Sequence, residues 1–151
     1  MRRVFSLLAA ASLTALLASP ALAEEYAGAV TSTVVLKATK TAAGQPVVYP
    51  TGGPAEVTAA IVTIAPGAET GWHSHEVPVY AWVVAGTLRV EYDGAAPVTV
   101  RAGEPLVEAV GVAHDGRNAG TEPVKLLVFY TGIEGKPNVA KAARPAATPP
   151  R

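Results

Sequence analysis

Apolar and polar residues alternate in short runs along most of the chain, and Gly, Pro and Asp separate the runs. Successive side chains of a strand point to opposite faces, so this pattern predicts β-strands that each bury one face. Beyond the first 23 residues, no segment sustains the 3.6-residue period of an amphipathic helix. Strands are expected at 31–41, 47–50, 56–67, 79–94, 96–105, 106–110 and 124–132.

Turn signals divide these expected strands. Gly-containing pairs close successive runs at Pro66-Gly67, Ala85-Gly86, Asp93-Gly94 and Ala102-Gly103. Residues 79–94 are expected to form a hairpin that bends at Ala85-Gly86. Several short strands in a chain of 151 residues predict a single all-β domain, either a sandwich or a barrel.

The first 23 residues have the three regions of a secretory signal peptide. Arg2 and Arg3 precede an apolar run over 4–17, and small residues end the segment at Ala21-Leu22-Ala23. The mature chain is therefore expected to begin at Glu24, in the periplasm or outside the cell, without a membrane anchor. The arginine pair also partly resembles a twin-arginine signal, so general secretion and twin-arginine export both stay open.

The composition changes again near the C-terminus. Residues 134–151 are rich in Ala and Pro with scattered positive charge, and the last aromatic residue is Tyr130. Such a composition lacks the apolar side chains that a packed core needs. The expected organisation is a signal peptide at 1–23, a β-domain at 24–133 and a disordered tail at 134–151.

Charge and cysteine content exclude several functions. Basic and acidic residues balance at 12 each, and removal of Arg2 and Arg3 would leave the mature chain slightly acidic. This net charge provides no electrostatic attraction for nucleic acid or an anionic membrane. The chain has no cysteine, so a disulfide is excluded and any metal site must use nitrogen and oxygen ligands. No phosphate-binding loop or G-x-S-x-G motif is present.

The histidines are the candidate chemistry of this sequence. His73 and His75 are two residues apart, so on a strand they share one face and could bind one cation. Imidazole suits Fe, Zn, Ni and Cu, whereas Mn favours oxygen ligands. The pair alone also fits two hydrogen-bonded or solvated histidines at a strand end. The chain's third histidine, His114, lies in a second Gly-punctuated segment.

Two spaced motifs over residues 57–130 resemble those of the cupin family. The family's first motif reads Gly-x₅-His-x-His-x₃₋₄-Glu-x₆-Gly, where x is any residue. Its second motif reads Gly-x₅-Pro-x-Gly-x₂-His-x₃-Asn. Matching positions are Gly67, His73, His75 and Gly86 in the first motif and Gly103, Gly111, His114 and Asn118 in the second. Ala109 replaces the proline, and Val79 stands where the family has glutamate.

The resemblance implies a small single-domain cupin β-barrel of jelly-roll type. It implies a three-histidine metal site of His73, His75 and His114, with open positions for a small anionic substrate. Iron(II) is the expected ion, and Zn, Ni, Cu and Mn are alternatives. A dioxygenase is the first expectation for the activity, followed by a lyase. A non-catalytic module that binds a small ligand or a metal remains the alternative.

Val79 removes the usual carboxylate, and three other side chains are candidates for a ligand or an acid–base group: Glu76, Tyr80 and Glu108. Strand alternation points Val79 inward and Tyr80 and Trp82 outward. Outward aromatic residues would leave an apolar patch on a monomer. The sequence therefore also predicts a homodimer.

Overall fold

The computed structural model describes residues 29–146. The expected signal peptide at 1–23 and the last five residues lie outside this range. Within this range, residues 34–146 belong to one compact unit, and residues 29–33 belong to a separate unit. All the strands lie in the larger unit, as far as the described residues go. No helix among the described residues is long and apolar enough to cross a membrane.

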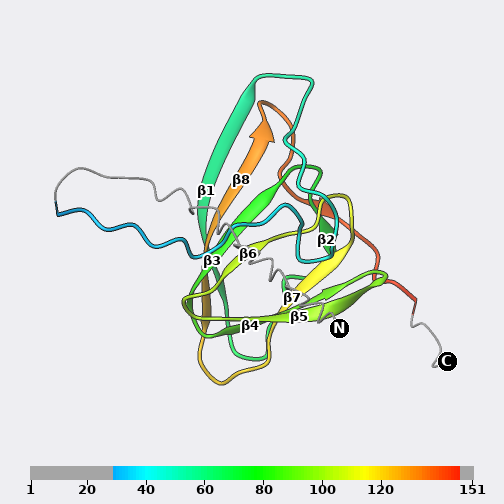
Figure 1. Ribbon diagram of the computed structural model, residues 1–151. Coiled ribbons are helices and arrows are strands. Elements are labelled where there is room, and N and C mark those ends of the chain that lie inside the picture. The colour runs from blue at the N-terminus through cyan, green and yellow to red at the C-terminus, as the bar shows by residue number, and fades with distance from the viewer. Residues whose placement is uncertain (1–28, 147–151) are drawn as a thin grey trace, which may run out of the picture. The chain divides into compact units, whose positions relative to one another are not determined.

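Within residues 29–146, nine strands form two antiparallel sheets, which confirms the predicted all-β fold. Figure 1 shows how the strands of the two sheets are arranged. The four-stranded sheet has the order β1 (Ala55–Ile64), β8 (Val124–Ile133), β3 (Val79–Ala85) and β6 (Pro105–Val107). The five-stranded sheet has the order β5 (Ala95–Arg101), β4 (Thr87–Tyr92), β7 (His114–Asn118), β2 (His73–Ser74) and β9 (Ala140–Lys141).

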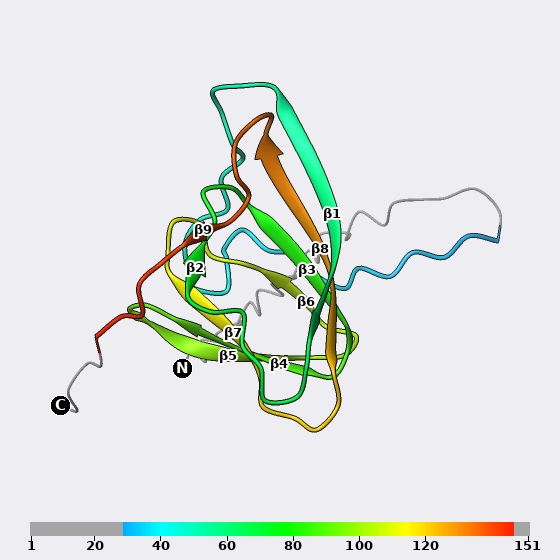
Figure 2. The same ribbon diagram turned by 180° about the vertical axis from the view of Figure 1, so that it is seen from behind.

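The core lies between the inner faces of the two sheets. Alternation along β3 buries Val79, Ala81 and Val83, while Tyr80 and Trp82 stay partly exposed on the opposite face. The other buried side chains include Leu88 and Val90 from β4, Val100 from β5 and Leu126 and Val128 from β8. Figure 2 shows from behind how β1, β8 and β3 run side by side while β4 and β5 cross near their lower ends. The period-two pattern therefore predicts which side chains form the core.

The expected hairpin over 79–94 is wrong, because β3 and β4 belong to different sheets. Gly86 is the corner between them, with φ of 79°. A Cβ at this position would lie 2.9 Å from the carbonyl oxygen of Pro123. Glycine is required here both by conformation and by close approach, so the chain turns from one sheet into the other. A true hairpin follows at Asp93-Gly94, where Tyr92 pairs with Ala95.

The strand expected at 31–41 is absent. Residues 31–38 have no regular structure, and an isolated bridge joins Lys40 to Pro46. Val34, Val35 and Leu36 are exposed. β-branched residues favour a strand only where a neighbouring strand and a buried face are available. This segment has neither within the described residues, so its composition alone does not make it a strand.

The segment after Ile133 packs on the domain, in contrast to the disordered tail expected from Glu134. Its strand β9 pairs with β2, and the Ala142 N–H donates to the Trp72 carbonyl at 2.9 Å. The Asn138 side-chain amide donates to Thr58 Oγ1 at 3.0 Å. Main-chain hydrogen bonds order this segment, and they do not depend on the apolar side chains that it lacks.

Candidate metal centre

The structure brings the three histidines together inside the domain. His73 on β2 and His114 on β7 are register partners, and His75 follows β2 directly. The ring centroids lie 4.5 Å apart for His73 and His114, and His75 lies 5.0 Å from each of them. One nitrogen from each ring falls within 4.8 Å of the others. Such a cluster has the spacing that a shared metal ion needs.

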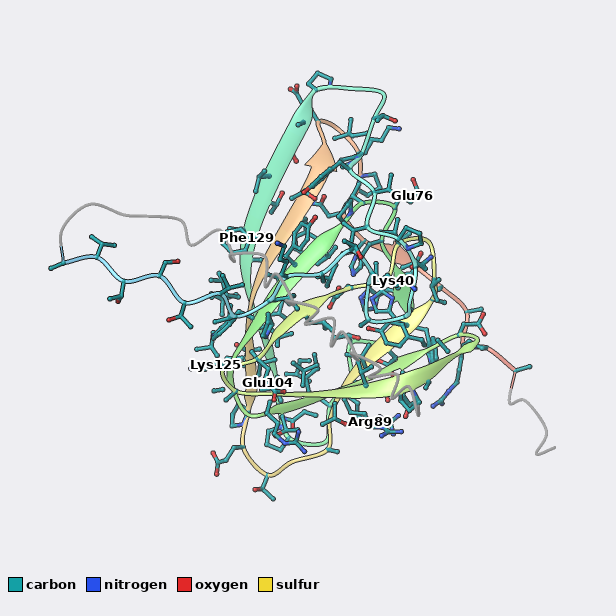
Figure 3. The ribbon with its side chains drawn as sticks, viewed as in Figure 1. Lys40, Glu76, Arg89, Glu104, Lys125 and Phe129 are labelled. Atoms are coloured by element: carbon teal, nitrogen blue, oxygen red, sulfur yellow. The ribbon has the colours of Figure 1, made fainter. Side chains whose placement is uncertain are left out.

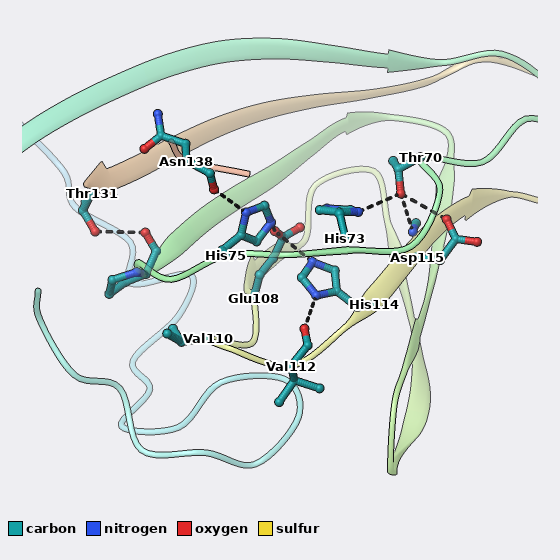
Figure 4. A network of polar contacts seen from close by, with 12 residues as sticks. Thr70, His73, His75, Glu108, Val110, Val112, His114, Asp115, Thr131 and Asn138 are labelled. Atoms are coloured by element: carbon teal, nitrogen blue, oxygen red, sulfur yellow. Dashed lines mark hydrogen bonds and ion pairs between the residues drawn. The ribbon is translucent and has the colours of Figure 1, made fainter. Parts of the chain in front are cut away.

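Main-chain carbonyls fix the orientation of all three rings, and Figure 4 shows those of Asn138 and Val112 at His75 and His114. Each Nδ1 lies 2.8 Å from a carbonyl oxygen, which can only accept, so each Nδ1 carries the proton. The acceptors are Gly71 for His73, Asn138 for His75 and Val112 for His114. In the neutral imidazole the lone pair is then on Nε2. This is the outer hydrogen bond that metal-binding histidines commonly make.

The inward-facing nitrogen atoms lack ordinary partners. Among the described residues, Nε2 of His75 and Nε2 of His114 are buried and make no hydrogen bond of acceptable geometry. Buried polar atoms in folded proteins are rarely left without a partner, and a bound ion can satisfy such atoms. Three neutral nitrogen donors on one side of a cavity fit a divalent transition metal ion.

Glu108 faces the same nitrogen atoms. Its Oε2 lies 2.9 Å from Nε2 of His75 and 3.7 Å from Nε2 of His114, and its side chain is 12% exposed. Burial acts to raise the pKa of Glu108, but contacts with the two imidazoles outweigh burial and hold that pKa at about 2. The carboxylate is therefore ionised at any ordinary pH. The same contact outweighs burial at His114 and raises its pKa, whereas burial lowers the pKa of His73.

The other candidates from the sequence lie elsewhere. Glu76 is exposed to solvent (Figure 3). Tyr80 lies on the outer face of β3, where it pairs with Phe129 and Val107. Val79 faces inward as expected and is fully buried. Of the three proposed acid–base groups, the structure places only Glu108 at the histidines.

Two residues at the site carried no recognisable signal in the sequence. Thr70 Oγ1 donates to Asp115 Oδ1 at 3.1 Å and accepts from the Gly116 N–H at 2.9 Å. These bonds tie the segment before β2 to β7. Asn138 contributes a main-chain oxygen, which any residue type has, so its side chain could not have revealed this role.

The space around the histidines has two parts. An inner cavity of about 50 Å³ is lined by the three histidines, Glu108, Thr70, Tyr130 and apolar side chains. A wider hollow of about 410 Å³ shares Thr70, His73 and Tyr130 with it and is also lined by Lys141. The inner cavity has room for an ion with one or two water-sized ligands. A larger molecule fits only the outer hollow.

Similarity to a known family agrees with this architecture. The family model described as the cupin domain matches residues 60–130, which include both histidine segments. The chain belongs to the cupin superfamily. No curated protein matches the sequence of this cupin.

Similar folds occur in several solved structures. A chain from the crystal structures of DMSP lyases has a TM-score of 0.51 and 20% identity, and the match covers 58% of this cupin and 44% of that chain. An oxalate oxidase has a TM-score of 0.50 and 27% identity, with coverage of 56% and 45%. Oxalate decarboxylase from Lactobacillus farciminis has a TM-score of 0.50 and 24% identity, with coverage of 56% and 26%. The match spans less than half the length of each of these proteins.

Proposed function

We propose that this cupin binds one divalent transition metal ion through Nε2 of His73, His75 and His114. The observation that carries the proposal is the convergence of three rings whose Nδ1 atoms are all held by main-chain carbonyls. Iron(II) is the expected ion, with Zn, Ni, Cu and Mn as alternatives. Such an ion supplies a Lewis acid that polarises a bound anion and, if it is iron, a centre for O₂ chemistry.

The proposed substrate is a small anion such as a carboxylate. Lys141 lines the outer hollow beside His73, and its positive charge would attract an anion to this part of the site. Similarity to an oxalate oxidase, at 27% identity, supports a small carboxylate as the ligand class. We propose O₂-dependent oxidation as the first reaction class, with bond cleavage by a lyase as the second.

Non-catalytic binding is the second candidate function. The observation that favours it is the scarcity of acid–base groups, because the inner cavity is lined by only one carboxylate, that of Glu108. If this carboxylate binds the metal, the acid–base groups that remain among the described lining residues are the histidines and the phenol of Tyr130, whose pKa is raised by burial. A protein of this kind would bind a metal and an anion without forming a product.

Metal analysis of the mature protein, purified from its own compartment without added metal, tests the proposal. About one equivalent of one transition metal is expected. His75→Ala and the less buried His73→Ala should both lose it while circular dichroism shows a folded protein. O₂ uptake and product analysis with oxalate and other small carboxylates then separate an enzyme from a binder. A folded wild-type protein that binds no transition metal would overturn the proposal.

Export and dimer formation are further proposals for this cupin. The signal-like segment supports export to the periplasm or beyond, and mass spectrometry of the secreted protein should find Glu24 as the first residue. The outer face of the four-stranded sheet supports a homodimer. Ile61 and Phe129 on this face are 65% and 40% exposed. Phe129→Glu should convert the dimer to a monomer in light scattering, and a monomeric wild type would contradict the proposal.

A further inference from the structure

Glu108 and Val79 occupy facing positions on neighbouring strands. The ladder between β3 and β6 ends with Tyr80 opposite Val107, so the next facing positions are 79 and 108. The Glu108 N–H donates to the Val79 carbonyl at 2.9 Å, which continues the pairing by one residue. Side chains at facing positions of antiparallel strands lie on the same face, with Cβ atoms about 4.5–5.5 Å apart. Position 108 therefore reaches the same part of the interior as position 79.

The two positions have exchanged their expected chemistry. Val79 is 0% exposed and offers no ligand atom, although the first motif has glutamate at this point. Glu108 has its carboxylate in the cavity instead, with Oε2 2.9 Å from Nε2 of His75. The negative charge is thus present at the histidines, but it comes from the neighbouring strand.

The geometry of the contact between Glu108 and His75 fits a shared metal ion. Because the Asn138 carbonyl holds the proton on Nδ1, a neutral His75 presents the lone pair of Nε2 toward the carboxylate oxygen. Two electron-rich atoms at 2.9 Å repel unless a proton or a metal ion lies between them. The direction of the ring does not suit an N–H hydrogen bond, since Nε2 is without a hydrogen-bond partner of acceptable geometry. A metal ion in contact with both atoms removes the repulsion.

We propose that Glu108 is the fourth protein ligand of the metal and takes over the role that Val79 cannot fill. The inference rests on the proposed three-histidine site. Its chemical consequence is a centre with three neutral ligands and one anionic ligand, so the net charge of the site falls from +2 to +1. An anionic oxygen ligand favours Fe(II) and Mn(II) more than three imidazoles alone would. The centre also keeps fewer open positions for a substrate.

The test compares Mn(II) and Fe(II) affinities of wild type, Glu108→Gln and the exchanged variant Val79→Glu/Glu108→Val. Calorimetry under anaerobic conditions should show affinity at least about tenfold weaker in Glu108→Gln, because the amide is neutral and a poorer donor. The exchanged variant should regain most of the lost metal affinity, since its carboxylate is on residue 79, which faces residue 108 across the two strands. Glu122→Gln, at an exposed glutamate, is the matched control and should bind as wild type does.

A crystal structure of the wild-type protein loaded with Zn(II) makes the test independent of whether the variants fold. A distance of about 2.0–2.2 Å between a Glu108 oxygen and the metal is expected. A metal bound by the three histidines with Glu108 beyond coordination distance would overturn the inference and leave the proposed function intact. Unchanged affinity in Glu108→Gln with loss of turnover would also overturn it, because Glu108 would then be an acid–base group. If folded wild type binds no metal, the proposed function fails as well.

Discussion

Nδ1 of His75 donates a hydrogen bond to the main-chain carbonyl of Asn138 at 2.8 Å. The two residues are 63 positions apart in the sequence, and Asn138 lies beyond the last long strand of the domain. The carbonyl selects the tautomer that offers Nε2 to the cavity. The C-terminal segment is therefore part of the candidate site, although its composition is typical of a tail.

Truncation after Ile133 should weaken metal binding. Removal of the Asn138 carbonyl frees the His75 ring and its tautomer, and loss of such an outer partner typically lowers metal affinity about 10–100-fold. A chain that ends at Ala146 retains all of these contacts and is the matched control. Calorimetric titration with Mn(II), after circular dichroism confirms folding, measures the effect. Equal affinities in the two truncated proteins would show that the segment does not support the site.

Substitution of Gly86 should destabilise the domain more than a typical turn glycine. In Gly86→Ala the new Cβ lies 2.9 Å from the Pro123 oxygen and 3.0 Å from the Val124 Cα, in addition to the strain of a φ of 79°. The expected loss of unfolding free energy is about 3 kcal/mol. Gly94→Ala has a similar φ of 71° but no atom within 4 Å of the new Cβ, so about 1 kcal/mol is expected.

Urea unfolding of the two alanine variants separates steric clash from backbone strain. The difference between their unfolding free energies measures the clash alone, because both variants force alanine into the left-handed region. If the two variants lose the same stability, β3 and β4 tolerate a wider corner than the structure shows.

The core and the shared face of His73 and His75 could be predicted from the sequence because both depend on local rules; His114 is joined to them only by the resemblance to the cupin motifs. Period-two alternation places Val79 inside and Trp82 outside, and two histidines separated by one residue share a face wherever the chain is extended. The positive φ angles of Gly67 and Gly103, at 73° and 87°, match the sharp turns expected there. These features need no knowledge of which strands are neighbours.

The features that the sequence left open or did not indicate depend on pairing between distant segments. Glu108 is one of three candidates, and the fold distinguishes it from Glu76 and Tyr80 because β6 pairs with β3 in one particular register. Asn138 reaches His75 because β9 pairs with β2. Residues 31–38 have strand-forming side chains but no partner among the described residues. Strand neighbours and register are properties of the whole fold, so composition could not supply them.

Asn118 should be required for stability rather than for metal binding. Its fully buried side chain donates to the carbonyls of Ile64 at 2.9 Å and Glu122 at 2.8 Å, and accepts from the Gly120 N–H at 2.9 Å. Asn118→Ala leaves these three main-chain groups without their partner, and the orphaned Ile64 carbonyl, whose bond is buried, costs about 1–3 kcal/mol.

Asn118→Ala is therefore expected to lose about 2–3 kcal/mol in denaturant unfolding. Any folded fraction should bind Mn(II) with the affinity of wild type, because Asn118 is not among the residues that line the inner cavity. A stable variant with weakened metal binding would reverse this assignment and make Asn118 part of the site.

Lys141 should control the affinity for an anion and leave the affinity for the metal nearly unchanged. Its side chain lines the outer hollow but not the inner cavity. Lys141→Ala should weaken oxalate binding to the metal-loaded protein about 3–10-fold, which corresponds to loss of one charged contact at a solvent-accessible site. Lys136→Ala removes the same charge at a position that does not line this hollow, and is the matched control. Isothermal titration at low salt measures both constants. Equal losses in the two lysine variants would indicate a general charge effect, and Lys141 would then have no specific role in anion recognition.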